Sequence, residues 1–221
     1  MGVVSVAWAM DAHAARPMLT DDARVVDAGA CQVESWVMGQ AGVRELWALP
    51  ACSGGPGVEW ALGAQQSRLI QAGAPRLSGL AQYKRLLREL QAGSVGVAVA
   101  GGSLLSEDAR VLPYLVLPMS WMSPDESTLV HLNVGRASKP RGILKDNTRG
   151  LGLEQQLTHS LWLVAERYSP SATQWQAQAG LRWWVVAGQL QLDATTGQLH
   201  GAGPSARFAS VGLRWIFQRP F

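Results

Sequence analysis

The C-terminal segment of the chain places the tightest constraint on its fold. Apolar residues recur there at every second position, and the last residue of the chain is in phase with them: Ala209, Val211, Leu213, Trp215, Phe217 and Phe221. The residues between them include Ser210, Gly212 and Arg214. A period of two is typical of a β-strand with one apolar and one polar face. The segment therefore predicts a strand that turns Arg214 away from an apolar core or a lipid phase.

The bulk composition excludes several classes of protein. The chain has 221 residues, of which 48% are hydrophobic and 16% charged, so it is not typical of disordered proteins. A membrane-spanning helix needs roughly 20 consecutive apolar residues. The longest apolar run, residues 111–122, is interrupted by Pro113 and Pro118. The apolar residues must therefore lie in short elements, as in a soluble all-β core or a membrane β-barrel.

Similar alternation, broken by Gly, Pro, Asn, Asp and Ser, recurs along most of the chain. We predict an all-β fold with about twelve antiparallel strands, near residues 31–39, 43–52, 57–66, 78–90, 94–102, 110–119, 126–136, 149–157, 159–168, 173–184, 188–196 and 206–217. An even number of strands is typical of bacterial membrane barrels. A helix is the alternative interpretation of residues 80–90, because Arg85 and Glu89 would face outward on a strand.

The strand predicted near 173–184 carries an aromatic residue at each end of its apolar face. Trp175 and Trp183 occupy these positions, with Leu181 and small residues between them. The chain holds ten Trp against three Phe and three Tyr, and Trp is common at membrane–water interfaces. We therefore predict a single antiparallel transmembrane β-barrel with Trp175 and Trp183 as interfacial aromatic residues. A soluble β-sandwich, which would bury the same face, is the alternative.

Charged residues fall on the opposite, polar faces of the predicted strands. In a barrel these faces line the lumen, where ionisable groups pair with each other and with water. The predicted lumenal charges are Glu59, Lys84, Arg88, Glu154, Glu166, Arg182, Asp193 and Arg214. A barrel of about twelve strands has a narrow interior. These residues therefore surround a channel or binding lumen, or they fill it completely.

The predicted connections fall into a short set and a longer set. Outer-membrane barrels have short periplasmic turns and longer extracellular loops. We predict short turns at 53–56, 91–93, 120–125, 158 and 185–187, and on the other side loops at 40–42, 67–77, 103–109, 137–148, 169–172 and 197–205, most of them longer. The basic residues between Arg136 and Arg149 then lie in a solvated loop on the cell-surface side. No aromatic residues alternate with them to stack on bases, so no nucleic-acid partner is predicted.

The two cysteines face each other in the first predicted hairpin. A turn centred on Ala41 and Gly42 pairs Cys31 with Cys52, and residue 36 with residue 47. Directly opposed residues have Cβ atoms about 4.5–5.5 Å apart, which is close enough for a disulfide. We predict a Cys31–Cys52 disulfide and hence an oxidising compartment. Two unrelated buried thiols are the alternative.

The N-terminus divides into three predicted regions. Residues 3–10 are apolar and precede Ala12-His13-Ala14, which resembles a signal-peptidase site, although the usual basic residues before the apolar stretch are missing. We predict a truncated signal peptide over 1–14, a periplasmic or lumenal segment over 15–30 and the barrel over 31–221. A buried N-terminal strand is the alternative for the first region.

Two motifs carry a resemblance to known proteins. The alternating strand that ends on Phe221 resembles the last strand of bacterial outer-membrane β-barrels, which is the signal read by the barrel assembly machinery. The resemblance implies this role for Trp215, Phe217 and Phe221. The string Arg16-Pro17-Met18-Leu19-Thr20-Asp21-Asp22, followed by Gln32-Val33-Glu34, is similar to the opening of an outer-membrane family named for the meta-pathway of phenol degradation. It implies the outer membrane of a Gram-negative bacterium, with membrane lipid and the assembly machinery as partners.

The predicted function is a narrow channel or a binding lumen for small molecules. A closed structural barrel without transport and a soluble secreted β-sandwich or lipocalin-like binder are the alternatives.

An enzyme is not predicted. Twelve-stranded outer-membrane phospholipases use a Ser, a His and an Asn, and Ser127, His131 and Asn133 share one face here. Residues 131 and 133 lie about 6.5–7 Å apart along a strand, too far for direct contact. No metal or other cofactor is predicted, because the remaining histidines lack metal-ligand spacing: His13, His159 and His200.

Overall fold

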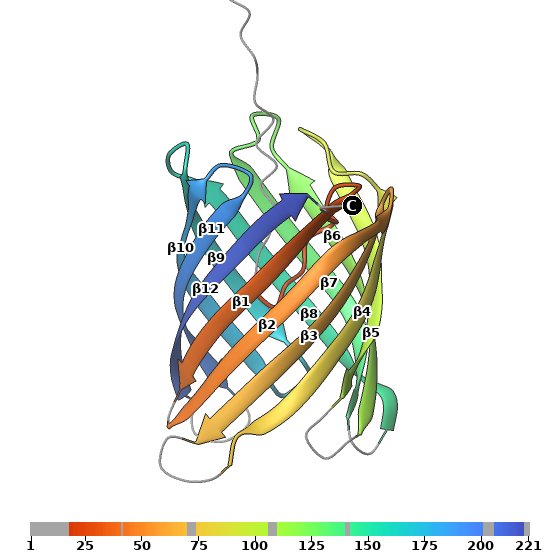
Figure 1. Ribbon diagram of the computed structural model, residues 1–221, viewed down its shortest axis with the longest axis vertical. Helices are drawn as coiled ribbons and strands as arrows, with labels where there is room; N and C mark the ends of the chain where they lie inside the picture. Colours follow the sequence, from red (N-terminus) through yellow and green to blue (C-terminus); the bar gives the residue numbers. More distant parts are fainter. Residues whose placement is uncertain are drawn as a thin grey trace, which may run out of the picture.

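The C-terminal segment forms the predicted strand, and the chain closes into a barrel with it (Figure 1). The computed structural model describes residues 18–40, 42–69, 74–105, 110–139, 142–200 and 206–218. Its strands are β1 (Ala30–Gln40), β2 (Val43–Gly55), β3 (Val58–Leu69), β4 (Arg76–Arg88), β5 (Val95–Leu105), β6 (Val111–Met122), β7 (Thr128–Lys139), β8 (Gly142–Gln156), β9 (Leu161–Ser169), β10 (Trp175–Val186), β11 (Leu190–His200) and β12 (Ala206–Gln218). Each pairs with its neighbours in sequence, and β12 pairs antiparallel with β1. The predicted twelve-stranded antiparallel barrel is confirmed.

The helical interpretation of residues 80–90 is wrong. These residues belong mostly to β4, which pairs with β3 on one side and β5 on the other. Hydrogen-bonded neighbours on both sides outweigh the weak helical preference of the segment. The described part of the chain contains no helix that is long and apolar enough to cross a membrane.

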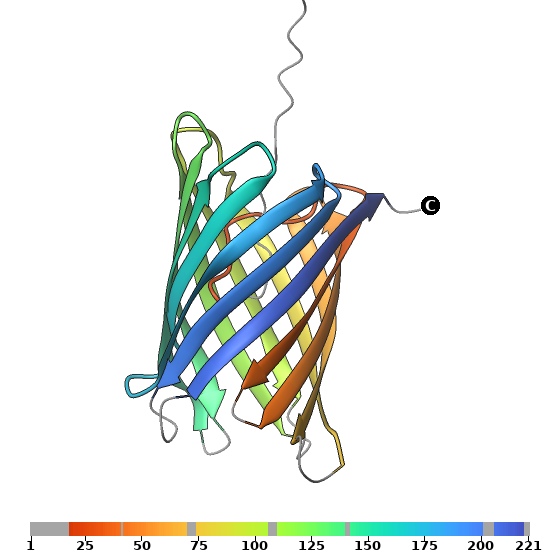
Figure 2. The same ribbon diagram turned by 90° about the vertical axis from the view of Figure 1, so that its left-hand side faces the viewer.

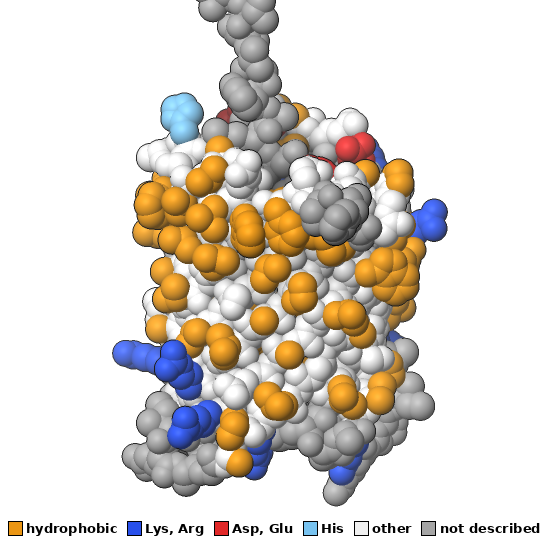
Figure 3. Space-filling model, in the orientation of Figure 1, with side chains coloured by type: hydrophobic (Ala, Val, Ile, Leu, Met, Phe, Trp, Pro, Cys, Tyr) orange, Lys and Arg blue, Asp and Glu red, His pale blue; other side chains and the backbone are white. Residues whose placement is uncertain are grey.

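Alternate residues of each strand face the lumen and the outside. In β12, Val211 and Trp215 expose 62% and 52% of their surface, whereas Ser210 and Arg214 are buried. We call the end where β1 begins and β12 ends the proximal end, and the opposite end the distal end. Figure 3 shows hydrophobic side chains over much of the outer face, most densely near the proximal end, and Lys and Arg side chains mainly toward the distal end. On the side shown in Figure 3, the outer face is therefore an apolar band with a basic distal border.

Aromatic side chains gather on the outer face near the proximal end. Four exposed tryptophans lie close to the proximal ends of their strands: Trp60, Trp121, Trp183 and Trp215. The ring of Phe217 lies 4.9 Å from that of Trp215. Trp175 lies at the distal end of β10, where its ring stacks 5.2 Å from that of His200. Trp175 and Trp183 thus occupy opposite ends of the outer face of β10.

The predicted difference between short and long connections is wrong. The proximal connections are 56–57, 89–94, 123–127, 157–160 and 187–189, and the distal ones are 41–42, 70–75, 106–110, 140–141, 170–174 and 201–205. Strand pairing continues through much of what the sequence marked as loop. In the β7–β8 hairpin, for example, Arg136 pairs with Asn147 and Arg149 with Val134. These two basic residues therefore lie on strands, because a paired neighbour strand overrides the turn preference of Asp, Asn and Gly.

The first hairpin has the predicted register. Cys31 lies opposite Cys52 and forms a disulfide with it, with Cα atoms 4.0 Å apart. Trp36 lies opposite Trp47, and their rings stack with centroids 5.1 Å apart.

Some predictions concern residues that the structure does not describe. The signal peptide over 1–14 and the terminal Phe221 lie outside the described residues, as does Arg141 of the basic segment.

Candidate functional site

A stretch of chain that belongs to no strand runs inside the barrel. Residues 18–29, which we call the internal segment, precede β1 and lie in the lumen (Figure 2). The Glu166 carboxylate accepts hydrogen bonds from the backbone N–H of Leu19 at 3.0 Å and of Thr20 at 2.8 Å. Asn133 accepts from the N–H of Asp21 at 2.7 Å and donates to its carbonyl oxygen at 2.7 Å. Buried backbone groups need such partners, and here lumenal side chains supply them.

Two further lumenal side chains hold the internal segment. The Ser120 hydroxyl accepts a hydrogen bond from the N–H of Ala23 at 2.8 Å, and the Glu59 carboxylate accepts one from the N–H of Val26 at 2.9 Å. Ala23 and Val26 are buried. The segment is therefore fixed along its length by side chains from several strands.

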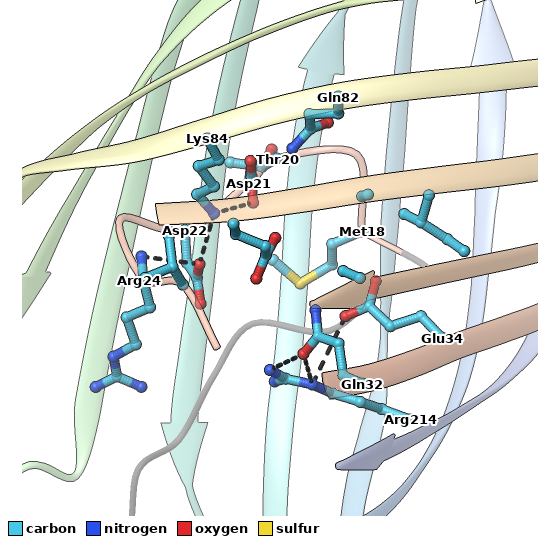
Figure 4. Close-up of a pocket in the computed structure, with 15 residues that line it drawn as sticks. Met18, Thr20, Asp21, Asp22, Arg24, Gln32, Glu34, Gln82, Lys84 and Arg214 are labelled. Atoms are coloured by element: carbon cyan, nitrogen blue, oxygen red, sulfur yellow. Dashed lines mark hydrogen bonds and ion pairs between the residues drawn. The ribbon is translucent and has the colours of Figure 1, made fainter. Parts of the chain in front are cut away.

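A lysine pairs with two consecutive aspartates of the internal segment (Figure 4). Lys84 Nζ lies 2.8 Å from Asp21 Oδ1 and 3.2 Å from Asp22 Oδ1. Lys84 and Asp22 are each 3% exposed, so neither charge would be tolerated here without its partner. The cavity left around this pair has a volume of about 30 Å³, enough for only a few water molecules.

Glycines on β8 make room for the internal segment. A Cβ atom at Gly150 would lie 2.7 Å from Thr20 Oγ1, and one at Gly152 would lie 2.9 Å from Met18 Cε. Both distances are shorter than van der Waals contact. The inner face of β8 is therefore shaped to accept the segment.

Buried charges form a connected cluster on the other side of the proximal lumen. Arg182 donates to Asp193 at 2.8 Å and to Glu154, and Glu154 Oε1 lies 3.2 Å from His131 Nε2. His131 Nδ1 in turn lies 2.8 Å from Ser120 Oγ. All five side chains are at most 2% exposed. Because Ser120 also holds the internal segment, the cluster and the segment belong to one hydrogen-bond network.

The structure does not bring Ser127, His131 and Asn133 together, in line with the expected lack of direct contact. Ser127 Oγ donates to Asp125 in the proximal turn at 2.9 Å, and Asn133 binds the internal segment. Hydrogen bonds from Ser123, and then from Ser127, hold the pKa of the exposed Asp125 carboxyl below its ordinary value. The serine that meets His131 is Ser120, which lies opposite it across the β6–β7 hairpin.

The order Ser120–His131–Glu154 is that of a hydrolase triad, but its surroundings are not those of an active site. Ser120 is 1% exposed and His131 and Glu154 are 0% exposed. The serine hydroxyl is engaged by the Ala23 N–H, and Glu154 by Arg182. A nucleophile must reach its substrate, so this arrangement is structural while the internal segment is in place.

Seven of the eight predicted lumenal charges are buried: Glu59, Lys84, Glu154, Glu166, Arg182, Asp193 and Arg214. Arg214 donates to Gln32 at 2.9 Å, and its Nε lies 3.7 Å from Glu34. The expectation for Arg88 is wrong. The β4–β5 register shifts between Leu86 and Arg88, so that Arg88 pairs with outward-facing Val97 and is exposed. A bulge of one residue turns the following side chain to the other face.

An apolar cluster contributes to closing the proximal lumen, and the sequence did not reveal it. It consists of Met122, Leu129, Trp162 and Trp184, with Leu90 and Ile216 packed against it. Trp162 and Trp184 occupy inward positions of β9 and β10. The adjacent pairs Leu161-Trp162 and Trp183-Trp184 were the available signal, because two consecutive large apolar residues at a strand end must face both ways.

The distal half of the lumen is hollow. It contains a cavity of about 460 Å³ that reaches Gln40, Ser138 and Leu199 near the distal ends of their strands. Leu19 and Asp21 of the internal segment line it from the proximal side. The arrangement can therefore accept a small molecule in the distal half, and the internal segment stands between that molecule and the proximal end.

Comparison with known proteins places the chain in a family. The family described as "Uncharacterised conserved protein UCP029691" matches residues 3–217. The chain belongs to this family. No relative was found among curated proteins.

Two solved porin structures share the fold. The KdgM porin in complex with disordered oligogalacturonate has a TM-score of 0.67 and 10% sequence identity, covering 85% of this chain and 99% of that chain. The NanC porin has a TM-score of 0.64 and 8% identity, covering 83% and 98%. The fold is therefore that of an outer-membrane β-barrel, as the C-terminal alternation predicted.

Proposed function

We propose that this protein is an outer-membrane β-barrel that admits a small molecule to its lumen and passes it on only when the internal segment moves. One observation carries the proposal. The lumen is hollow in its distal half, and the internal segment on the proximal side of the cavity is held by side chains rather than by strand pairing.

Several observations support a membrane location in a Gram-negative bacterium. Large apolar side chains such as Leu62 and Val211 are exposed on the outer face, and tryptophans border it at the proximal end. A Cys31–Cys52 disulfide suits an oxidising compartment. The proximal end would face the periplasm, with residues 1–14 as a cleaved signal peptide, 15–30 as the lumenal segment and 31–221 as the barrel. Membrane lipid and the assembly machinery would be its partners, the latter through Trp215, Phe217 and Phe221.

The internal segment has the properties of a movable closure. A barrel strand exchanges ladder hydrogen bonds with two neighbours, whereas the contacts given above hold the segment by side-chain hydrogen bonds and an ion pair. Each hydrogen bond to a charged acceptor contributes about 1.5–3 kcal/mol. A segment outside the strand ladder can open locally before the whole molecule unfolds. Release would uncover a polar path beside β1–β4 that includes Lys84, Glu59 and Gln32.

The charged side chains around the cavity limit the chemical class of solute that it can bind. Oligogalacturonate, which the KdgM structure contains, is an acidic saccharide. In this chain the charged side chains that line the cavity are Asp21, which pairs with Lys84, Glu45 and Arg136, so the lining has no excess of positive charge. We therefore do not propose an acidic saccharide here. Similarity to the family of the phenol meta-pathway stays a prediction that rests on the Arg16-Pro17 and Thr20-Asp21-Asp22 strings.

Planar-bilayer conductance tests the proposal. We expect the refolded full-length chain to show little conductance, and a variant lacking residues 18–26 to show stepwise opening. A synthetic peptide of residues 18–29 should close the shortened variant, whereas a peptide of the same composition in scrambled order should not.

Each unfavourable result would reject a distinct part of the proposal. Equal conductance of the two proteins would exclude the internal segment as the closure. No conductance of the shortened variant, despite a folded barrel on a heat-modifiability gel, would favour a closed structural barrel. A protein that stays monomeric and folded without detergent would favour the soluble binder.

A further inference from the structure

We propose that the distal cavity is a binding site for an uncharged, largely apolar molecule that carries a planar ring and a hydrogen-bonding group. Trp36, Trp47 and Ser210 would make the decisive contacts. The inference deepens the proposed function and rests on it, because a solute would bind in this cavity, on the distal side of the internal segment, before it passes through.

The lining of the cavity is more apolar than a water-filled pore requires. Inward-facing positions of porin strands are usually polar. Here several such positions carry Leu80, Leu104, Tyr114 and Phe208, which all line the cavity. Leu80 and Trp36 are buried and pack with Leu104 and Tyr114 in one cluster. An enclosed apolar surface of this kind favours an apolar occupant over water.

The tryptophan pair provides a flat surface for a ring. The rings of Trp36 and Trp47 are nearly parallel, with an interplanar angle of 10°. Trp47 Nε1 donates to Glu45 at 3.4 Å, which limits rotation of its indole. Aromatic rings pack favourably in offset stacks. A planar ring of the ligand would continue this stack at the wall of the cavity.

The three charged side chains that line the cavity give it no excess of either sign. Asp21 is paired with Lys84, whereas Glu45 and Arg136 carry opposite charges and are hydrogen-bonded to neutral side chains. A charged ligand would lose its hydration in a largely apolar cavity without meeting a net counter-charge there. Transfer of an unpaired charge into such a site is strongly unfavourable. The site therefore selects an uncharged molecule.

A buried hydroxyl without a partner points to the polar group of the ligand. Ser210 lines the cavity and is 3% exposed, and its Oγ has no hydrogen-bond partner among the described residues. Gln40 also lines the cavity, and its buried Oε1 atom likewise has no hydrogen-bond partner among the described residues. Buried polar atoms in proteins are normally hydrogen-bonded. A ligand N–H or O–H group would satisfy either of them.

The cavity volume sets the size of the ligand. A volume of about 460 Å³ lies within the usual range for small-molecule sites, roughly 300–1,000 Å³. A molecule with two or three fused or linked rings would fill it.

A matched pair of fluorescent probes tests the predicted chemistry. N-phenyl-naphthylamine is uncharged and has aromatic rings and one N–H group, whereas anilinonaphthalene sulfonate has the same skeleton with a negative charge. Binding would be measured by probe fluorescence on the full chain in lipid nanodiscs, with empty nanodiscs as the background. We expect one saturable site per barrel for the neutral probe, with a Kd about tenfold or more below that of the sulfonate. Equal or tighter binding of the sulfonate would overturn the proposal.

Substitutions then locate the site. Trp36→Leu should weaken binding of the neutral probe about tenfold. The matched control Trp60→Leu changes a tryptophan on the outer face, 57% exposed, and should leave binding unchanged. Ser210→Ala removes only the unpartnered hydroxyl and should weaken binding about threefold or more. Equal effects of Trp36→Leu and Trp60→Leu, or no effect of Ser210→Ala, would reject this location.

The probe-binding measurement and the conductance measurement test different parts of the two proposals. If the probe fails to bind while the variant lacking 18–26 conducts, the binding site is rejected and the channel stands. If the probe binds as expected while that variant stays closed, the site stands and the channel is rejected.

Discussion

The Glu166 carboxylate joins the barrel wall to the start of the internal segment. It accepts hydrogen bonds from the N–H groups of Leu19 and Thr20, and from the side-chain amides of Gln176 and Gln178. The ionised carboxylate has enough acceptor positions for all four donors. Glu166 is therefore the residue whose change should affect the position of the segment most directly.

Glu166→Gln should loosen the start of the internal segment without unfolding the barrel. The variant keeps one acceptor oxygen but loses the charge and the second oxygen, and bonds to charged acceptors are the stronger ones. We expect the amides of Leu19 and Thr20 to exchange with solvent deuterium about tenfold faster. Glu89→Gln, an exposed carboxylate in a proximal turn, is the matched control. Unchanged exchange in the Glu166 variant would contradict the role assigned to this side chain.

At the residue scale, the alternation of apolar and polar residues predicted which side chains face the lumen, but it did not predict which residues they contact there. Glu154, Arg182 and Asp193 could be placed in the lumen by counting positions, and they lie there. The contact between Ser120 and His131 depends on the β6–β7 register, and the contact of Ser120 with Ala23 depends on a segment without periodicity. Arg88 was misplaced because a single-residue bulge leaves no mark in the alternation.

At the element scale, the hairpin register was predictable where a turn was unambiguous. The Ala41-Gly42 turn alone placed Cys31 opposite Cys52. Strand ends were less predictable, because ladder hydrogen bonds continue into segments rich in Gly, Asn and Asp. The β7–β8 hairpin, which reaches Lys139 and Gly142, shows this most clearly.

The β1–β2 disulfide should stabilise the barrel measurably. It links residues 21 positions apart, and a cross-link of this kind contributes about 2–4 kcal/mol, largely by restricting the unfolded chain. Reductant should therefore lower the urea midpoint of the detergent-solubilised protein, monitored by tryptophan fluorescence. A Cys31→Ser, Cys52→Ser double variant should have the lower midpoint from the start and show no response to reductant. An identical midpoint for oxidised and reduced wild type would contradict the prediction.

At the scale of the whole molecule, the barrel combines two different interiors. The proximal half is filled by an ionic network, an apolar cluster and the internal segment, whereas the distal half holds the cavity. Alternation could predict a polar lumen, but not how it is filled. The filling depends on side-chain size, on consecutive apolar residues such as Trp183-Trp184, and on a chain segment that enters from outside the sheet.

The outer face allows a decisive test of whether this molecule lies in a membrane. Val211, in the central part of β12, exposes 62% of its surface, and so an arginine there would be harmless in water. In a bilayer, an arginine on the lipid face near the midplane costs about 2–4 kcal/mol, falling to about 0–1 kcal/mol near the interface. We therefore expect Val211→Arg to destabilise the folded barrel in lipid vesicles by about 2–4 kcal/mol relative to the wild type. Leu157→Arg, at a proximal turn with 52% exposure, is the matched control and should cost little. Equal and small costs for both variants would mean that water, not lipid, surrounds the outer face.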